Sequence, residues 1–163
     1  MTTPIAAAFF NNSALTWGLV ACGVAQLSKL FVELLQHGRW RPAVLLETGG
    51  MPSSHSALVT GTATAIAWEN GLDSPLFALA VTVAFVVMYD ASGVRRAAGK
   101  MAERLNSLGE AQGLASLKTS LGHSRPQVLV GSLLGPLVAI LGEAFLGSPL
   151  ALAQRFGLFV GVG

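Results

Sequence analysis

Residues 14–35 read ALTWGLVACGVAQLSKLFVELL, and this stretch decides the class of fold. Its polar members are Gln26, Ser28, Lys29 and Glu33. At a rise of about 1.5 Å per residue, a helix of this length crosses a hydrocarbon core of about 30 Å. The two charged residues lie near its end, where long side chains reach the interface. We therefore expect a membrane-spanning helix, capped by residues 11–13.

The composition of the whole chain agrees with a membrane protein. Charged residues make up 11% of its 163 residues, whereas soluble domains contain about 25%. So few charges would not cover the surface of a soluble domain. The net charge of +2 gives no indication of a nucleic-acid partner. We expect one integral membrane domain over residues 1–163.

Further apolar segments of helical length follow the first one. They cover residues 53–68, 76–89 and 128–146. The first of these is short and rich in Ala, Thr and Gly, which favours close packing against other helices. Residues 149–162 are apolar but short, which indicates a tilted or partial fifth helix. The expected fold is an all-α polytopic bundle of about four to five membrane helices.

Two polar segments, residues 36–52 and 92–125, should lie on the same side of the membrane. They contain eight of the ten Lys and Arg residues, and the turn at 69–75 contains none. The positive-inside rule therefore places both segments in the cytoplasm. Within the second segment, Met101, Leu105 and Leu108 recur at helical spacing, which predicts an amphipathic helix on the membrane surface.

The most distinctive motif is GGMPSSHSA at residues 49–57. Glycines, a proline, hydroxyls and His55 stand together at the start of an apolar segment. The backbone N–H groups of a helix N-terminus are a ready-made anion site. The expected topology also brings residues 95–123 to this membrane face. Their arginines clamp oxyanions, one histidine can attack phosphorus, and a second can protonate the leaving oxygen.

Three stretches in this order carry a resemblance to a known family. They are GGMPSSHSA at 49–57, DASGVRR at 90–96 and LGH at 121–123. They resemble the type 2 phosphatidic acid phosphatase superfamily, which also includes vanadium-dependent haloperoxidases. The likeness is closest to its divergent branch of small bacterial and plastid membrane proteins, and it runs from about residue 29 to about residue 135.

The resemblance implies roles for individual residues. His123 would be the nucleophile that forms a phosphohistidine, and His55 would be the general acid. The phosphoryl oxygens would be held by a larger group, namely Arg95, Arg96, Lys29, Arg41, Ser53 and Ser54. No metal or other cofactor is required by this mechanism. The implied activity is hydrolysis of lipid or isoprenoid phosphate monoesters or pyrophosphates. Haloperoxidase activity is a further option, after the non-catalytic alternative described next.

One departure from the family pattern supports an alternative. Gln127 stands four residues after His123, where the family has a carboxylate that orients the histidine. Either Asp90 or Glu110 replaces that carboxylate in space, or the chain is a poor enzyme. The alternative is a non-catalytic protein whose degenerate pocket binds anionic lipid headgroups or a partner protein.

Plainer interpretations of the same residues stay open. His55 and His123 can each simply cap a helix, and a haem-ligating histidine has no supporting pattern. Arg95 and Arg96 can serve only topology and lipid contact, the role that we favour for Lys100 and Arg104. The weak fifth helix leaves protein surface to cover, so we expect a homo-oligomer or a larger membrane complex.

Overall fold

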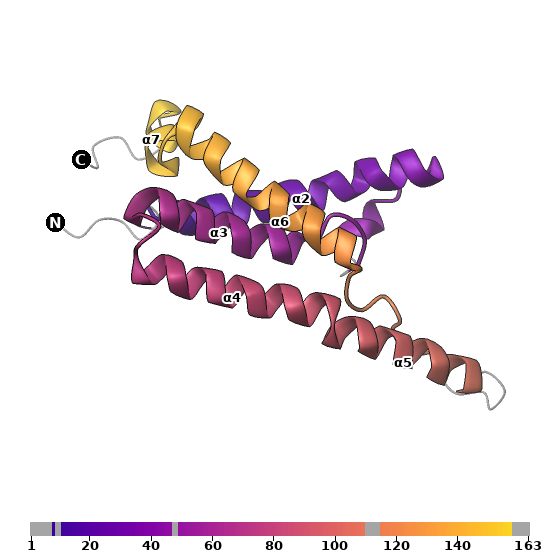
Figure 1. Cartoon of the computed structure of the whole chain (residues 1–163). Coiled ribbons are helices and arrows are strands. Elements are labelled where there is room, and N and C mark those ends of the chain that lie inside the picture. Colours follow the sequence, from indigo (N-terminus) through magenta and orange to yellow (C-terminus); the bar gives the residue numbers. More distant parts are fainter. Residues whose placement is uncertain (1–7, 9–10, 47–48, 110–114, 158–163) are drawn as a thin grey trace.

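The computed structural model of this chain describes residues 8, 11–46, 49–109 and 115–157, and its elements are helical (Figure 1). In chain order they are α2 (Ser13–His37), the 3₁₀ turn η1 (Pro42–Leu46), α3 (Ser54–Asn70), α4 (Pro75–Ser92), α5 (Val94–Gly109), α6 (Arg125–Leu141), the π-helical turn η3 (Gly142–Leu146) and α7 (Pro149–Arg155).

The helix ends follow from local sequence. Asn12 caps α2 by accepting a hydrogen bond from the N–H of Leu15 at 2.9 Å. The same helix ends at Gly38, whose φ of 62° is the left-handed conformation that favours glycine. Pro75 occupies the first turn of α4, where its missing N–H costs nothing.

Helix α3 is the central element of the bundle, and it packs against α2, α4 and α6. The contacts are made by small side chains, as expected for helices that approach closely in a membrane. Ala21, Ala57 and Ala139 are fully buried. A Cβ atom placed on Gly61 would lie 3.0 Å from the Cβ of Ala21 and 3.3 Å from the carbonyl oxygen of Gly135. Three helices therefore meet at this glycine.

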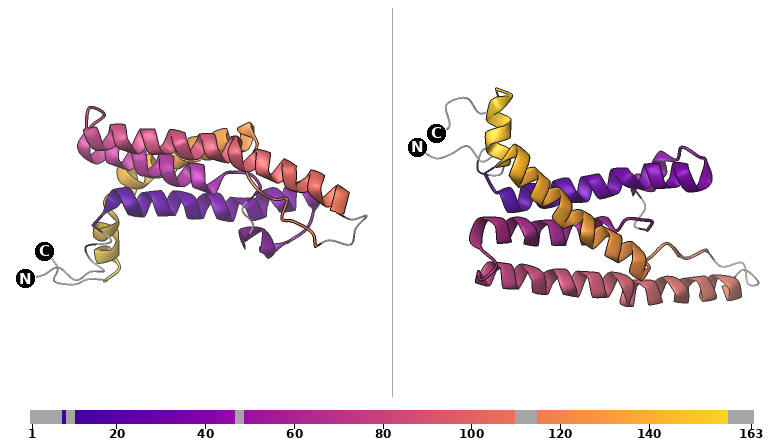
Figure 2. Two further views of the ribbon diagram at one scale, coloured as in Figure 1. Left: turned by 90° about the horizontal axis from the view of Figure 1, so that it is seen from below. Right: turned by 45° about the horizontal axis from the view of Figure 1, so that its top comes forward.

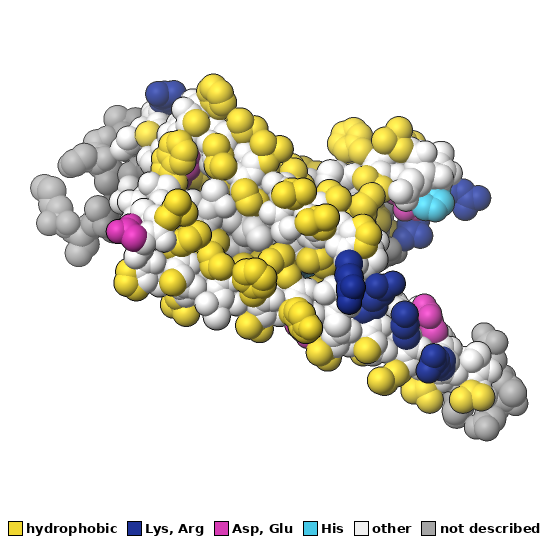
Figure 3. Space-filling view, in the orientation of Figure 1, with side chains coloured by type: hydrophobic (Ala, Val, Ile, Leu, Met, Phe, Trp, Pro, Cys, Tyr) yellow, Lys and Arg dark blue, Asp and Glu magenta, His cyan; other side chains and the backbone are white. Residues whose placement is uncertain are grey.

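Many large apolar side chains point outward instead of into the bundle, and they cover much of the surface in Figure 3. Three helices in the described ranges are long and apolar enough to cross a membrane: Ser13–His37, Pro75–Leu108 counted through Gly93, and Arg125–Leu146. Helix α3 lies alongside them and completes a four-helix bundle. The all-α membrane fold and the amphipathic helix expected from the sequence are confirmed.

Several helix boundaries differ from expectation: α3 runs to Asn70 instead of residue 68, and α4 runs to Ser92 instead of residue 89. Helix α2 extends past residue 35 to His37, because the glycine that ends it comes only at position 38. Helix α6 starts at Arg125, three residues before the expected start at residue 128. The apolar stretch at 149–162 forms a short helix that ends at Arg155, and its last part lies outside the described residues.

One end of the bundle carries most of the polar chain. The C-terminal end of α2, helix α5 and the loop before α6 lie there, and the turn between α3 and α4 lies at the other end (Figure 1). Both views of Figure 2 show α5 continuing from α4 beyond the bundle. This arrangement brings the two basic segments of the sequence to a common end.

Candidate functional site

The N-terminus of α3 is built by the serines of the GGMPSSHSA motif. The hydroxyl of Ser53 accepts hydrogen bonds from the N–H of Ser56 at 3.3 Å and from its hydroxyl at 2.9 Å. The N–H of Ser53 donates to the carbonyl of Gln127 at 3.1 Å, which joins α3 to α6. Ser53 and Ser54 are buried. In this structure the Ser53 hydroxyl caps a helix.

The loop before α6 is fixed against α4 and α5. The N–H of His123 donates to the carbonyl of Ala91 at 2.9 Å. Gly122 has a φ of 76°, and any Cβ there would overlap the backbone of Arg96. Further back, the side chain of Asn106 accepts from the N–H of Leu117 and donates to its carbonyl. These contacts position His123 at the end of α4.

A small cavity of about 70 Å³ joins three of the residues singled out from the sequence. His55 reaches it from α3, Arg95 from the start of α5, and His123 from the loop. Val87 and Ala91 of α4 form the apolar part of its wall. Both histidines and one arginine thus share a cavity large enough for several water molecules.

His123 is the most unusual side chain of this cavity. It is only 4% exposed, and neither ring nitrogen has a hydrogen-bond partner among the described residues. Burial of the ring is the main reason that the pKa of His123 is lowered to about 4. Three basic neighbours act in the same direction, namely Lys29, His55 and Arg95. At neutral pH the ring is therefore uncharged and keeps a lone pair for bonding.

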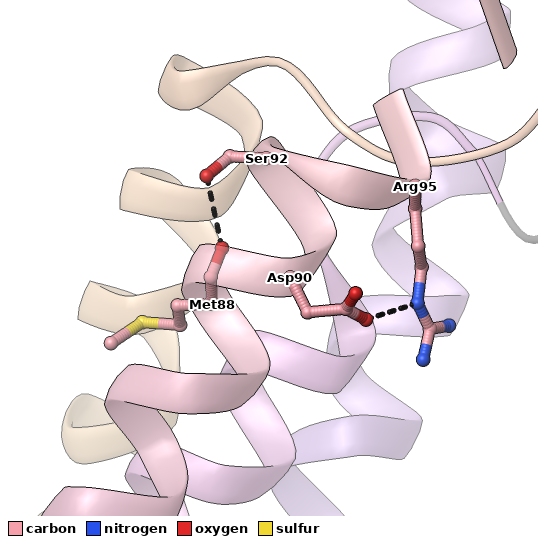
Figure 4. A network of polar contacts seen from close by, with 4 residues as sticks. All are labelled: Met88, Asp90, Ser92 and Arg95. Atoms are coloured by element: carbon pink, nitrogen blue, oxygen red, sulfur yellow. Dashed lines mark hydrogen bonds and ion pairs between the residues drawn. The ribbon is translucent and has the colours of Figure 1, made fainter. Parts of the chain in front are cut away.

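Arg95 is held by an acidic partner (Figure 4). Its Nε lies 2.6 Å from Oδ2 of Asp90, five residues earlier. The hydroxyl of Ser92 donates to the carbonyl of Met88 at 3.0 Å in the last turn of α4. Asp90 thus positions the guanidinium group and makes no hydrogen bond to His123.

A second, more open cavity of about 380 Å³ is also lined by this loop. We call it the polar basin. His123, Gly122 and Leu121 line both cavities. The charged side chains of the basin are those of Arg96, Lys100 and Glu103. His123 therefore stands between a small enclosed cavity and a larger polar one.

The other residues expected at the site lie at different distances from these cavities. Lys29 is 2% exposed, and a Cβ on Gly50 would be 3.8 Å from its Cδ, so it lies beneath the GGMPSSHSA motif. Arg41 forms an ion pair with Glu33 at 3.9 Å and lines neither cavity. Glu110 lies outside the described residues.

Comparison with known proteins places these features in a family. The model of the Divergent PAP2 family matches residues 10–138, which include both histidines and Arg95. This chain belongs to the divergent PAP2 family.

A curated relative in this divergent PAP2 family is an uncharacterized membrane protein of Bacillus subtilis (strain 168), YuiD. It is 36% identical over 148 residues, which cover 80% of this chain and 94% of the relative. No solved structure matches the chain. Membrane location is therefore supported both by the relative's description and by the three apolar helices.

The structure also clarifies Gln127 in this divergent PAP2 protein. Its side-chain oxygen accepts a hydrogen bond from the N–H of Ser124 at 2.7 Å, which caps the first turn of α6. Its amide oxygen is occupied at the helix end, and the side chain does not bond to the ring of His123.

The sequence did not indicate the apolar wall of the cavity or the position of Lys100. Val87 and Ala91 are four residues apart, so they lie on one face of α4, and Ala91 is the second residue of the DASGVRR motif. That spacing could have identified them. Lys100 was expected to contact lipid, and it also lines the polar basin, directly after Gly99 in the chain.

Proposed function

We propose that this protein is a membrane phosphatase that hydrolyses lipid or isoprenoid phosphates through a phosphohistidine. The observation that carries the proposal is the cavity shared by His55, Arg95 and His123. An uncharged, buried imidazole that has no hydrogen-bond partner in the described part of the chain is suited to nucleophilic attack. A guanidinium beside it can hold phosphoryl oxygens.

The reaction would proceed in two displacements. In the first, a ring nitrogen of His123 forms a P–N bond, the P–O bond to the lipid breaks, and protonated His55 gives its proton to the leaving oxygen. In the second, His55 takes a proton from water, the water oxygen bonds to phosphorus, and the P–N bond breaks. Inorganic phosphate leaves, and His55 is again protonated.

The side of the membrane and the substrate class are part of the same proposal. Lys and Arg side chains gather at the end of the bundle where the site lies (Figure 3). The positive-inside rule puts this end in the cytoplasm. The acyl or isoprenoid tail of the substrate would remain in the hydrocarbon layer, between the helices. Its phosphate would enter the cavity from the headgroup layer.

A second function has a specific observation in its favour. Among the described residues, no carboxylate bonds to the ring of His123, and Asp90 is already paired with Arg95. In a related catalytic triad, loss of the orienting carboxylate lowers the rate by about 10⁴. A pocket that binds anionic headgroups or a partner without turnover would need no such carboxylate.

Phosphate release by the purified protein separates these functions. With phosphatidic acid and a polyprenyl phosphate as substrates, the enzyme should release phosphate, and His123→Ala and His55→Ala should abolish release. His37→Ala is the matched control, because His37 is exposed and pairs with Glu33 at the end of α2. Wild-type protein without turnover on either substrate would contradict the phosphatase function.

Trapping of the intermediate tests the nucleophile directly. Labelled substrate quenched in alkali should leave phosphate on His123, since phosphohistidine survives base and is lost in acid. The label should be absent in His123→Ala and should accumulate in His55→Ala with an activated aryl phosphate, which needs no acid for its first step. Label retained in His123→Ala would exclude this residue as the nucleophile.

A further inference from the structure

Helix α5 has an apolar stripe that no part of the described chain covers. Met101, Leu105 and Leu108 are 62%, 56% and 69% exposed. Their spacing of four and three residues puts them on one face of the helix, together with exposed Val94. We call this face the α5 stripe.

Another face of α5 contacts the rest of this protein. Gly99 and Lys100 line the polar basin. Ala102 is buried, and Asn106 is bonded to Leu117 of the loop. The α5 stripe is therefore a separate surface that points away from the site.

The α5 stripe continues the outer surface of α4. Residues 75–108 form a nearly continuous helix of 34 residues that contains an apolar segment of membrane-spanning length, with exposed Leu79, Val83 and Val86 on its α4 part. In Figure 3, hydrophobic side chains follow the lower edge of α4 onto α5, while Lys and Arg side chains lie on the upper side of α5. At about 1.5 Å per residue such a helix exceeds a hydrocarbon core of about 30 Å, so α5 reaches the headgroup layer.

Charge selects between the possible occupants of the α5 stripe. Helix α5 carries Arg95, Arg96, Lys100 and Arg104 against one acid, Glu103. A second copy of this helix packed on the stripe would bring like charges together. Anionic lipid headgroups instead complement these side chains, and acyl chains complement the stripe.

We propose that α5 docks through the α5 stripe into the anionic leaflet, so that the polar basin opens among lipid headgroups. The docking surface and the basin are two sides of one helix. Lipid docking therefore sets the depth in the membrane at which an anionic headgroup meets Arg96 and Lys100. This docking does not depend on catalysis, and its test requires no turnover.

The test places a fluorescent label at single positions of α5 in the full chain. Leu105→Cys and Leu108→Cys are made in a Cys22→Ser background, with Ser107→Cys as the matched control, because exposed Ser107 lies outside the stripe. Each protein is placed in nanodiscs that hold one copy, with phosphatidylglycerol or phosphatidylcholine brominated on its acyl chains. The two stripe labels should be quenched in phosphatidylglycerol, and the Ser107→Cys label should stay exposed to water.

Each other outcome decides against part of the proposal. Stripe labels as water-exposed as the control in phosphatidylglycerol would overturn it. Quenching that is equal in the two lipids would show that leaflet charge plays no part. Shielding that arises only in discs with two copies would assign the stripe to a second protein chain. Salt at about 1 M, where the Debye length is roughly 3 Å, should reduce the preference for phosphatidylglycerol.

Discussion

At the scale of single residues, the protonation state of His123 is the property on which the chemistry depends. A charged ring could not attack phosphorus, because its lone pair would carry the proton. Burial keeps the ring neutral here, and no carboxylate of the described residues bonds to the ring to fix its orientation. The same burial opposes protonation of the ring in the folded chain, so its effect on the free energy of unfolding depends on pH.

Stability should therefore fall as the pH is lowered. The pKa of His123 is about 4 in the folded chain and 6.5 when unperturbed, so the unfolded chain gains this proton first. Above pH 6.5 the effect is absent, and by pH 4 it should amount to roughly 3 kcal/mol. The free energies of unfolding of the wild type and of His123→Gln, measured in detergent, should diverge over this pH range. Parallel pH dependence of the two proteins would rule out the lowered pKa.

Asp90 should matter more for ligand binding than for stability. Its ion pair with Arg95 is partly exposed, at 36% and 55% of the two side chains. Such pairs contribute about 1 kcal/mol or less to the free energy of unfolding. Asp90→Asn should therefore leave stability nearly unchanged and weaken phosphate binding, measured by titration with inorganic phosphate. Asp73→Asn, in the turn at the other end, should leave phosphate binding unchanged.

At the scale of helices, packing depends on glycines at the contacts of α3. A Cβ on Gly135 would overlap the hydroxyl of Thr60 and the carbonyl of Ala57. Gly135→Ala should lower the free energy of unfolding by about 1–3 kcal/mol. Gly23→Ala is the matched control, because a Cβ there meets no atom within 4 Å. A Gly135→Ala protein as stable as Gly23→Ala would show that α3 and α6 can separate without cost.

The helices themselves were largely predictable, because their signals are local. Apolar length, the Asn12 cap and Pro75 each act within a few residues of a helix end. The amphipathic pattern of α5 likewise repeats along one helix. The start of α6 at Arg125 was missed because Ser124 and Gln127 define it through a polar capping contact, whereas the prediction followed hydrophobicity.

At the scale of the whole molecule, the site could be predicted only as a set of residues. Topology brings His55 and His123 to one end, and the sequence led us to expect both histidines in one site at the same membrane face. The position of His123 between two cavities was not predictable. It depends on the hydrogen bond from the N–H of His123 to the carbonyl of Ala91, and on the close approach of Gly122 to the backbone of Arg96. Both contacts join segments that are far apart in the chain.

Orientation in the membrane is the remaining property of the whole molecule, and labelling can determine it. Ser116 lies in the loop at the site end, and Asp73 lies in the turn at the opposite end. In a Cys22→Ser background, a membrane-impermeant maleimide should label Asp73→Cys in intact cells and Ser116→Cys only after permeabilisation. This result follows from the positive-inside rule, because the site end carries the basic segments. The reverse pattern would put the cavity outside the cell and require its substrate to come from the outer leaflet.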